Sequence, residues 1–208
     1  MSKEKRLNLF VIISLIAISI VSVLGLFHIE NLASIGLIIG LVMYFVTGSQ
    51  KESFKLKDIP KALCDIKTII LVLLPTLSAF LSSFLAKYIM PGFSDHILSR
   101  TSFVPSEVLA LIPTLLIAAL GEEIAMRGFM QNQLTKYIKF IPALITTSVL
   151  FAMCHIAKGE LHIVLYDLAF IFIDSILYGL IFKKTNNVCV STIAHFIANL
   201  LSVLVFLR

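Results

Sequence analysis

Charged residues are scarce in this sequence. Aspartate, glutamate, lysine and arginine make up 14% of its 208 residues, whereas soluble domains carry about a quarter. It has no tryptophan, its residues are 59% hydrophobic, and the mean hydropathy is +1.01. This composition excludes an ordinary soluble domain and leaves no room for a sizeable soluble part. The sequence therefore predicts an all-α fold, a polytopic transmembrane helical bundle.

Cysteine is also scarce. The three cysteines, Cys64, Cys154 and Cys189, are odd in number and have no short spacing, which excludes a disulfide framework and a zinc knuckle. We interpret all three as reduced thiols, and Cys154 as a small buried apolar residue.

Long apolar runs predict about seven spans, within a range of about six to eight that the chain length allows. The runs cover residues 9–27, 32–47, 68–90, 105–137, 141–156, 161–182 and 188–207. Residues 1–104 would hold the first three spans and a basic loop, and residues 105–208 the core spans, in one integral membrane domain. In the second run, Gly36-x-x-x-Gly40 would let a neighbouring helix approach closely.

Lysine and arginine predict the orientation. If the N-terminus lies in the cytoplasm, twelve of them fall on the cytoplasmic side: Lys3, Lys5, Arg6, Lys51, Lys55, Lys57, Lys61, Lys67, Lys136, Lys139, Lys183 and Lys184. The other side has Lys87, Arg100, Lys158 and Arg208. This asymmetry predicts a cytoplasmic N-terminus. The net charge of +5 fits contact with anionic lipid and does not favour nucleic acid. A short chain with few loops suggests a bacterial plasma membrane protein.

Three ionisable groups, Glu122, Glu123 and Arg127, follow directly on the apolar stretch 108–120. A charge inside the bilayer costs about 3 kcal/mol on insertion scales, so such residues usually have a function. On a helix, Glu123 and Arg127 share a face and can pair, while Glu122 points roughly 100° away. Arg127 can then neutralise one carboxylate and leave the other free. The alternative is a purely structural ion pair with Glu122 at the water interface.

Further polar groups lie inside later spans: His155, and the pair His195 and Asn199, which are four residues apart and share a helix face. Glu122 and His155 each lie about 16 residues, roughly 24 Å, from a turn near Lys139. His195 lies roughly 15 Å beyond Lys183 and Lys184. The depths predict that Glu122, His155, His195 and Asn199 line one cavity, which we expect to open to the cytoplasmic side.

These groups suit peptide hydrolysis. A carboxylate in apolar surroundings can take a proton from water, and an imidazole can share that water or protonate the leaving amine. A second imidazole and an amide can donate to the oxyanion. Glu122, His155 and His195 could instead hold zinc with an open fourth position, although the His-Glu-x-x-His signature is absent. The residues leave both mechanisms open.

The ordered set Glu122-Glu123-x-x-x-Arg127, Phe151-x-x-x-His155 and His195-x-x-x-Asn199 resembles the CAAX-protease and bacteriocin-processing family of intramembrane endopeptidases, also called the ABI family. The matched region runs from about Leu109 to the end.

The resemblance implies an enzyme that cuts a peptide or membrane-tethered protein near the cytoplasmic face. It implies that Glu122 and His155 activate water and that His195 and Asn199 stabilise the oxyanion. Glu123 and Arg127 would be structural or orient the substrate. No cofactor is expected, with zinc as the second choice.

Two other functions remain as alternatives: a bacteriocin immunity protein that binds without required proteolysis, and a small transporter with a proton relay. Against the transporter, the sequence shows no inverted repeat. Asp167 and Asp174 lie seven residues apart in the sixth run, with Tyr178 continuing the stripe. They could line the cavity or orient a histidine, but we favour a structural role, such as a bond to Tyr178.

Overall fold

The structure is a computed structural model that describes residues 3–24, 32–100 and 108–206. These residues form helices, and no strand occurs among them, which confirms the all-α prediction. The longer helices are α1 (Lys3–Leu24), α2 (Leu32–Val46), α5 (Ile66–Ile89), α7 (Val108–Glu123), α9 (Phe140–Met153), α10 (Leu161–Thr185) and α11 (Val188–Phe206). Shorter ones are α3 (Gln50–Ser53), η2 (Leu56–Asp58), α4 (Ile59–Leu63), α6 (Phe93–Arg100), η3 (Ile124–Gln131) and α8 (Asn132–Leu134).

Five helical segments of the described chain are long and apolar enough to cross a membrane: Glu4–Leu24, Ile66–Ile89, Leu109–Leu134, Leu161–Thr185 and Val188–Val205. Two bent helices, Ser34–Val46 and Gln50–Leu63, would together make a sixth span, although the chain turns by 86° between them. Helix α9 has 14 residues, a length of about 21 Å. Each of the seven predicted runs is thus helical over most of its described residues, but only five or six of them qualify as spans.

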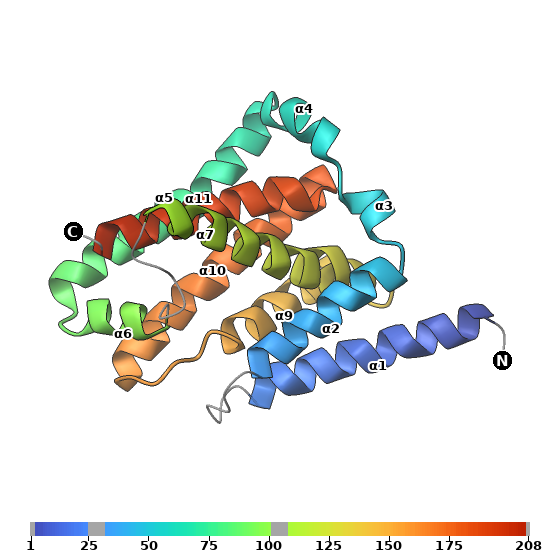
Figure 1. The fold of residues 1–208 in the computed structure, drawn as a ribbon, viewed down its shortest axis with the longest axis horizontal. Helices are drawn as coiled ribbons and strands as arrows, with labels where there is room; N and C mark the ends of the chain where they lie inside the picture. Colours follow the sequence, from blue (N-terminus) through green and yellow to red (C-terminus); the bar gives the residue numbers. More distant parts are fainter. Residues whose placement is uncertain (1–2, 25–31, 101–107, 207–208) are drawn as a thin grey trace.

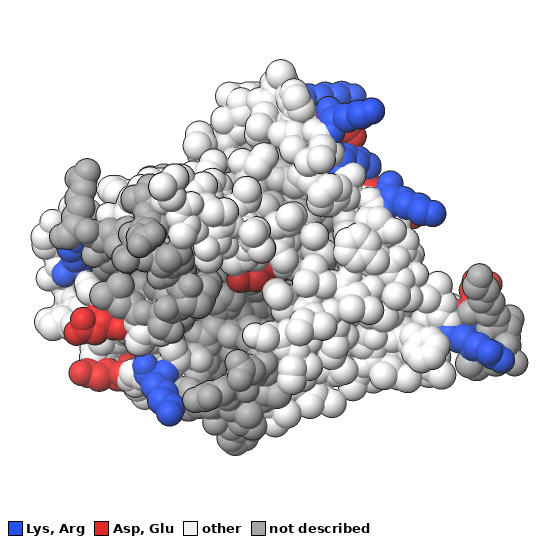
Figure 2. All heavy atoms as spheres, in the orientation of Figure 1, with Lys and Arg blue, Asp and Glu red and all other residues white. Residues whose placement is uncertain are grey.

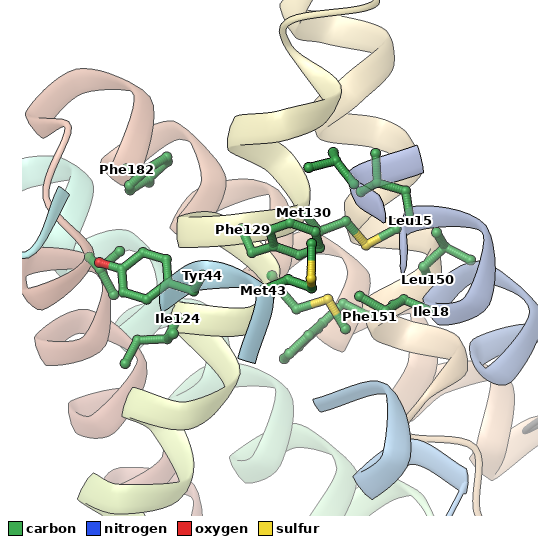
Figure 3. Close-up of a cluster of buried hydrophobic side chains, with 13 residues drawn as sticks. Leu15, Ile18, Met43, Tyr44, Ile124, Phe129, Met130, Leu150, Phe151 and Phe182 are labelled. Carbon is green, nitrogen blue, oxygen red and sulfur yellow. The ribbon is translucent and has the colours of Figure 1, made fainter. Parts of the chain in front are cut away.

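The helices form one bundle (Figure 1). Helices α5, α10 and α11 pack against one another, α7 packs against α11, and α2 lies between α1 and η3. The largest apolar cluster joins both halves of the chain (Figure 3): Tyr44 of α2 and Ile18 of α1 belong to the same buried cluster as Phe129 and Phe182. The N-terminal helices therefore complete the core of the C-terminal ones.

One of the two glycines of the predicted close-approach motif makes the contact. A Cβ added at Gly40 would lie 2.6 Å from the Cβ of Ala125, whereas one added at Gly36 would be 3.5 Å from its nearest neighbour, Val21. We therefore expect Gly40→Val to destabilise the fold by about 1–3 kcal/mol, through separation of α2 from η3. Gly36→Val is the matched control and should cost clearly less. Thermal unfolding in detergent measures both, and equal costs would contradict the close packing of α2 on η3.

Asp65 connects the start of α5 to the end of α10 outside the apolar segments. Its carboxylate lies 2.7 Å from Nζ of Lys184, accepts a hydrogen bond from the Thr68 hydroxyl, and accepts another from the backbone N–H of Lys67. The Lys184 hydrogen bond is the main cause that lowers the pKa of Asp65 to about 2. The loop at this end is therefore fastened by a carboxylate that stays ionised at neutral pH.

Candidate active site

The first motif lies where α7 changes its winding. Residues Ile124–Gln131 form a π-helical segment, and all eight are buried. Gly128 allows this tight packing, because a Cβ there would lie 2.5 Å from the Tyr44 ring and 3.1 Å from Val188. A π-helical turn is wider than an α-helical one and is frequent at functional sites. Here it follows directly on the two glutamates.

Glu123 and Arg127 form the predicted ion pair. Oε1 of Glu123 lies 2.9 Å from Nη1 of Arg127, and both side chains are fully buried. Nη2 of Arg127 also donates to the backbone carbonyl of Ser175 at 3.0 Å and to its hydroxyl at 2.8 Å. The guanidinium lies over the rings of Phe151 and Tyr178, 4.8 Å and 5.4 Å from their centroids. The pair therefore fixes η3 against α9 and α10.

His195 is held by Glu123 and Tyr178. Its Nδ1 lies 3.0 Å from Oε1 of Glu123, and its ring stacks on that of Tyr178 with centroids 4.5 Å apart and planes at 18°. An ionised carboxylate only accepts hydrogen bonds, so Nδ1 is the donor and carries the proton. In the neutral imidazole, Nε2 is then the unprotonated nitrogen. It lies 3.7 Å from Oε2 of Glu122.

His155 is held in a comparable way by its own helix. Its Nδ1 lies 2.8 Å from the backbone carbonyl of Phe151, which can only accept. Nε2 of the neutral ring is again the unprotonated nitrogen, and it lies 3.7 Å from the same Oε2 of Glu122. In both imidazoles, Nε2 therefore faces the same oxygen, Oε2 of Glu122. A separation of 3.7 Å is longer than a direct hydrogen bond and suits a bridging water or substrate atom.

Glu122 is the carboxylate that Arg127 leaves free. Its side chain is 23% exposed, and Oε2 is buried and accepts no hydrogen bond from the described residues.

Asn199 lies one turn beyond His195 on α11 and lines the same cavity as Glu122. This cavity has a volume of about 710 Å³ and is lined by Glu122, His155, His195 and Asn199 together with, among others, Leu37, Leu115, Ala118, Cys154, Tyr166, Asp167, Asp174 and Tyr178. The four residues predicted to share a cavity do so.

Sequence reasoning missed several neighbours. Ser175 holds Arg127 and showed no pattern of its own. Nε2 of His96 on α6 lies 3.1 Å from Oδ2 of Asp167, and both residues are buried. Asp167 and Asp174 both line the cavity, which was one of the roles considered from the sequence. The seven-residue spacing of the two aspartates had identified both in the sequence, whereas His96 and Ser175 showed no such pattern.

The residues were also tested as a metal site. In the part of the chain that the structure describes, no group of three or more histidine, cysteine, aspartate or glutamate side chains has an arrangement that could hold a metal ion. This includes the predicted zinc set of Glu122, His155 and His195. The zinc alternative stays a prediction, and the proposed reaction uses only the side chains of this protein.

Comparison with known protein families shows which family this chain resembles. Residues 104–201 match the model of a family described as Rce1-like, the type II CAAX prenyl endopeptidases. The match spans α7 to most of α11 and contains all seven motif residues. Residues 104–201, just under half of the chain, are thus similar to the Rce1-like family. No curated protein and no solved structure has a significant match to the chain.

This match confirms the resemblance of the sequence motifs to the CAAX-protease family. Together with five apolar helices of membrane-crossing length in the described chain, it supports an integral membrane peptidase of the CAAX type. The substrate of a peptidase is a peptide or protein. The roles of the individual residues are a separate question.

Proposed function

We propose that this Rce1-like protein is an intramembrane endopeptidase in which Glu122 and His155 activate a water molecule. One observation carries the proposal: Nε2 of His155 and Nε2 of His195 both lie 3.7 Å from Oε2 of Glu122. In their neutral tautomers the two imidazoles present acceptor nitrogens to the Glu122 carboxylate, which is also an acceptor. A group that donates hydrogen bonds is therefore needed to bridge them. Water is such a group, and the cavity beside it has room for a peptide.

The reaction balances with these residues alone. Glu122 takes a proton from the water while His155 orients it, and the water oxygen bonds to the carbonyl carbon of the substrate. The carbonyl electron pair moves onto oxygen. Glu122 or His155 then gives the proton to the amide nitrogen, the C–N bond breaks, and a carboxylic acid and an amine are released.

His195 and Asn199 are proposed to stabilise the oxyanion. Asn199 can donate from its amide group. Glu123 accepts from Nδ1 of His195 at 3.0 Å, which orients the ring so that Nε2 faces the reacting group and can donate to the oxyanion after it takes up the proton that Glu122 removed from the water. In this proposal Glu123 is a positioning residue, and Arg127 keeps it ionised.

Removal of the Asn199 amide tests the oxyanion role. We expect Asn199→Ala to lower kcat by about 10²–10³-fold with little change in KM, because the lost hydrogen bond forms only in the transition state. Asn8→Ala, an exposed change on α1, is the matched control. Kinetics of purified protein in lipid vesicles measure both. A raised KM at unchanged kcat would assign Asn199 to substrate binding instead.

The substrate and mechanism are tested together. Purified protein is incubated with prenylated C-terminal peptides and with unmodified peptide precursors, with and without a chelator. The proposal expects Glu122-dependent cleavage that the chelator leaves unchanged. Loss of activity with the chelator and recovery with zinc would favour the zinc mechanism. If protection against a bacteriocin survives in Glu122→Ala cells, that would favour binding without proteolysis.

A further inference from the structure

Most basic residues of the described chain lie at one end of the bundle. Helices α1, α5, α9 and α11 begin there, and α2, α8 and α10 end there. We call it the lysine-rich end: Lys3, Lys5, Arg6, Lys51, Lys55, Lys57, Lys61, Lys67, Lys136, Lys139, Lys183 and Lys184 lie at these helix ends or in the segments between them. Figure 2 shows basic side chains over α3 and α4 and at the start of α1, with a largely uncharged surface between them and the far end.

The opposite end is where α5 ends, α6 lies and α10 begins. By sequence it carries Lys87, Lys158 and Arg100, as well as Asp95 and Glu160. The positive-inside rule therefore assigns the lysine-rich end to the cytoplasm and this end to the other side.

The cavity lies in the half of the bundle away from the lysine-rich end. On α10, which runs toward that end, the described lining stops at Tyr178. On α11, which starts at that end, the described lining begins at His195 and continues to Val203. Phe93 and Ile97 of α6, at the far end, also line the cavity.

Packed side chains close the cavity toward the lysine-rich end. Tyr44, Phe129 and Val188 are fully buried and Phe182 is 5% exposed, all within one apolar cluster (Figure 3). Beside them, Nε2 of Gln131 donates to the backbone carbonyl of Gly179 at 3.0 Å. These groups fill the interior between Glu122 and the lysines.

Two sequence predictions are therefore in conflict, since a cytoplasmic N-terminus and a cavity open to the cytoplasm require opposite orientations of this fold. Twelve basic residues against four decide for the first. We infer that the cavity is reached from the non-cytoplasmic side, and that the segment cleaved belongs to a peptide or membrane protein that has been exported to that side. The statement about cleavage rests on the proposed function, whereas the orientation does not.

Thiol labelling of intact cells tests the orientation. In a chain whose three native cysteines are replaced, single cysteines are placed at Ser34, which is exposed and lines the cavity, at Glu160 and at Lys57, all exposed positions. We expect a membrane-impermeant maleimide to label Ser34→Cys and Glu160→Cys from outside at least tenfold faster than Lys57→Cys. In inverted vesicles the order should reverse. Labelling after detergent normalises each variant.

The opposite pattern, with only Lys57→Cys labelled from outside, would overturn the inference, as would labelling of Ser34→Cys only from the cytoplasmic side. Glu122-dependent cleavage, measured on the same membranes, is independent of either result. A wrong orientation and a wrong assignment of the active site are thus told apart.

Discussion

Glu122→Gln is expected to lower kcat by about 10²- to 10⁴-fold, the usual contribution of a general base. Glutamine keeps the size of the side chain and its hydrogen-bonding capacity but cannot take a proton from water. The imidazoles of His155 and His195 should stay in place, because Nδ1 of each is held by Phe151 and Glu123 rather than by Glu122. Substrate binding, and thus KM, should change little. Cleavage by purified protein in lipid vesicles gives both constants.

The matched control is Glu160→Gln, which removes the same charge from an exposed position outside the cavity. It should retain the activity of the unmodified protein. A Glu122→Gln protein that unfolds at the normal temperature and keeps more than a tenth of the activity would remove Glu122 from the chemistry.

Arg127→Met is expected to destabilise the protein by about 3–5 kcal/mol, the cost of leaving one partner of a buried ion pair unpaired. Both Arg127 and Glu123 are fully buried, so water cannot replace the lost guanidinium. The double variant Glu123→Gln with Arg127→Met should recover part of the loss, because no uncompensated charge remains. Unfolding of the two purified variants in detergent, relative to the unmodified protein, measures both effects.

Lys184→Met is the control for the loss of a lysine or arginine ion pair at a partly exposed site, since the Lys184 and Asp65 side chains are 32% and 43% exposed. Its effect should be much smaller. If Arg127→Met costs no more than Lys184→Met, the buried pair does not stabilise the fold as described.

Residue spacing along helices accounts for what the sequence predicted correctly. Glu123 and Arg127 pair because positions four apart on a helix share a face, and this held although the π-helical segment begins at Ile124. Counting residues from a turn placed Glu122 and His155 at one depth, and their side chains meet at 3.7 Å. The depth and the face of a side chain follow from the local geometry of its helix, which residue spacing in the sequence predicts.

The features that were missed depend on packing between helices. The His195–Glu123 hydrogen bond and the Arg127–Ser175 contact join residues 72 and 48 positions apart, which no local pattern connects. The 86° bend after α2 was not apparent from hydropathy alone. The side to which the cavity opens also depends on packing between helices, since Tyr44 and Phe182 lie in the buried cluster at one end.

The central claim is that one cavity, bounded by Glu122, His155, His195 and Asn199, holds the peptide bond that is cut. The most direct measurement is photo-crosslinking with a cleaved peptide that carries a photoreactive residue next to the scissile bond, followed by mass spectrometry of the labelled protein. The account predicts crosslinks to the cavity segments 115–126, 151–157 and 195–203, and their loss when excess unlabelled substrate competes. Competed crosslinks confined to the outer surfaces of α1 and α5, with none in these segments, would contradict it.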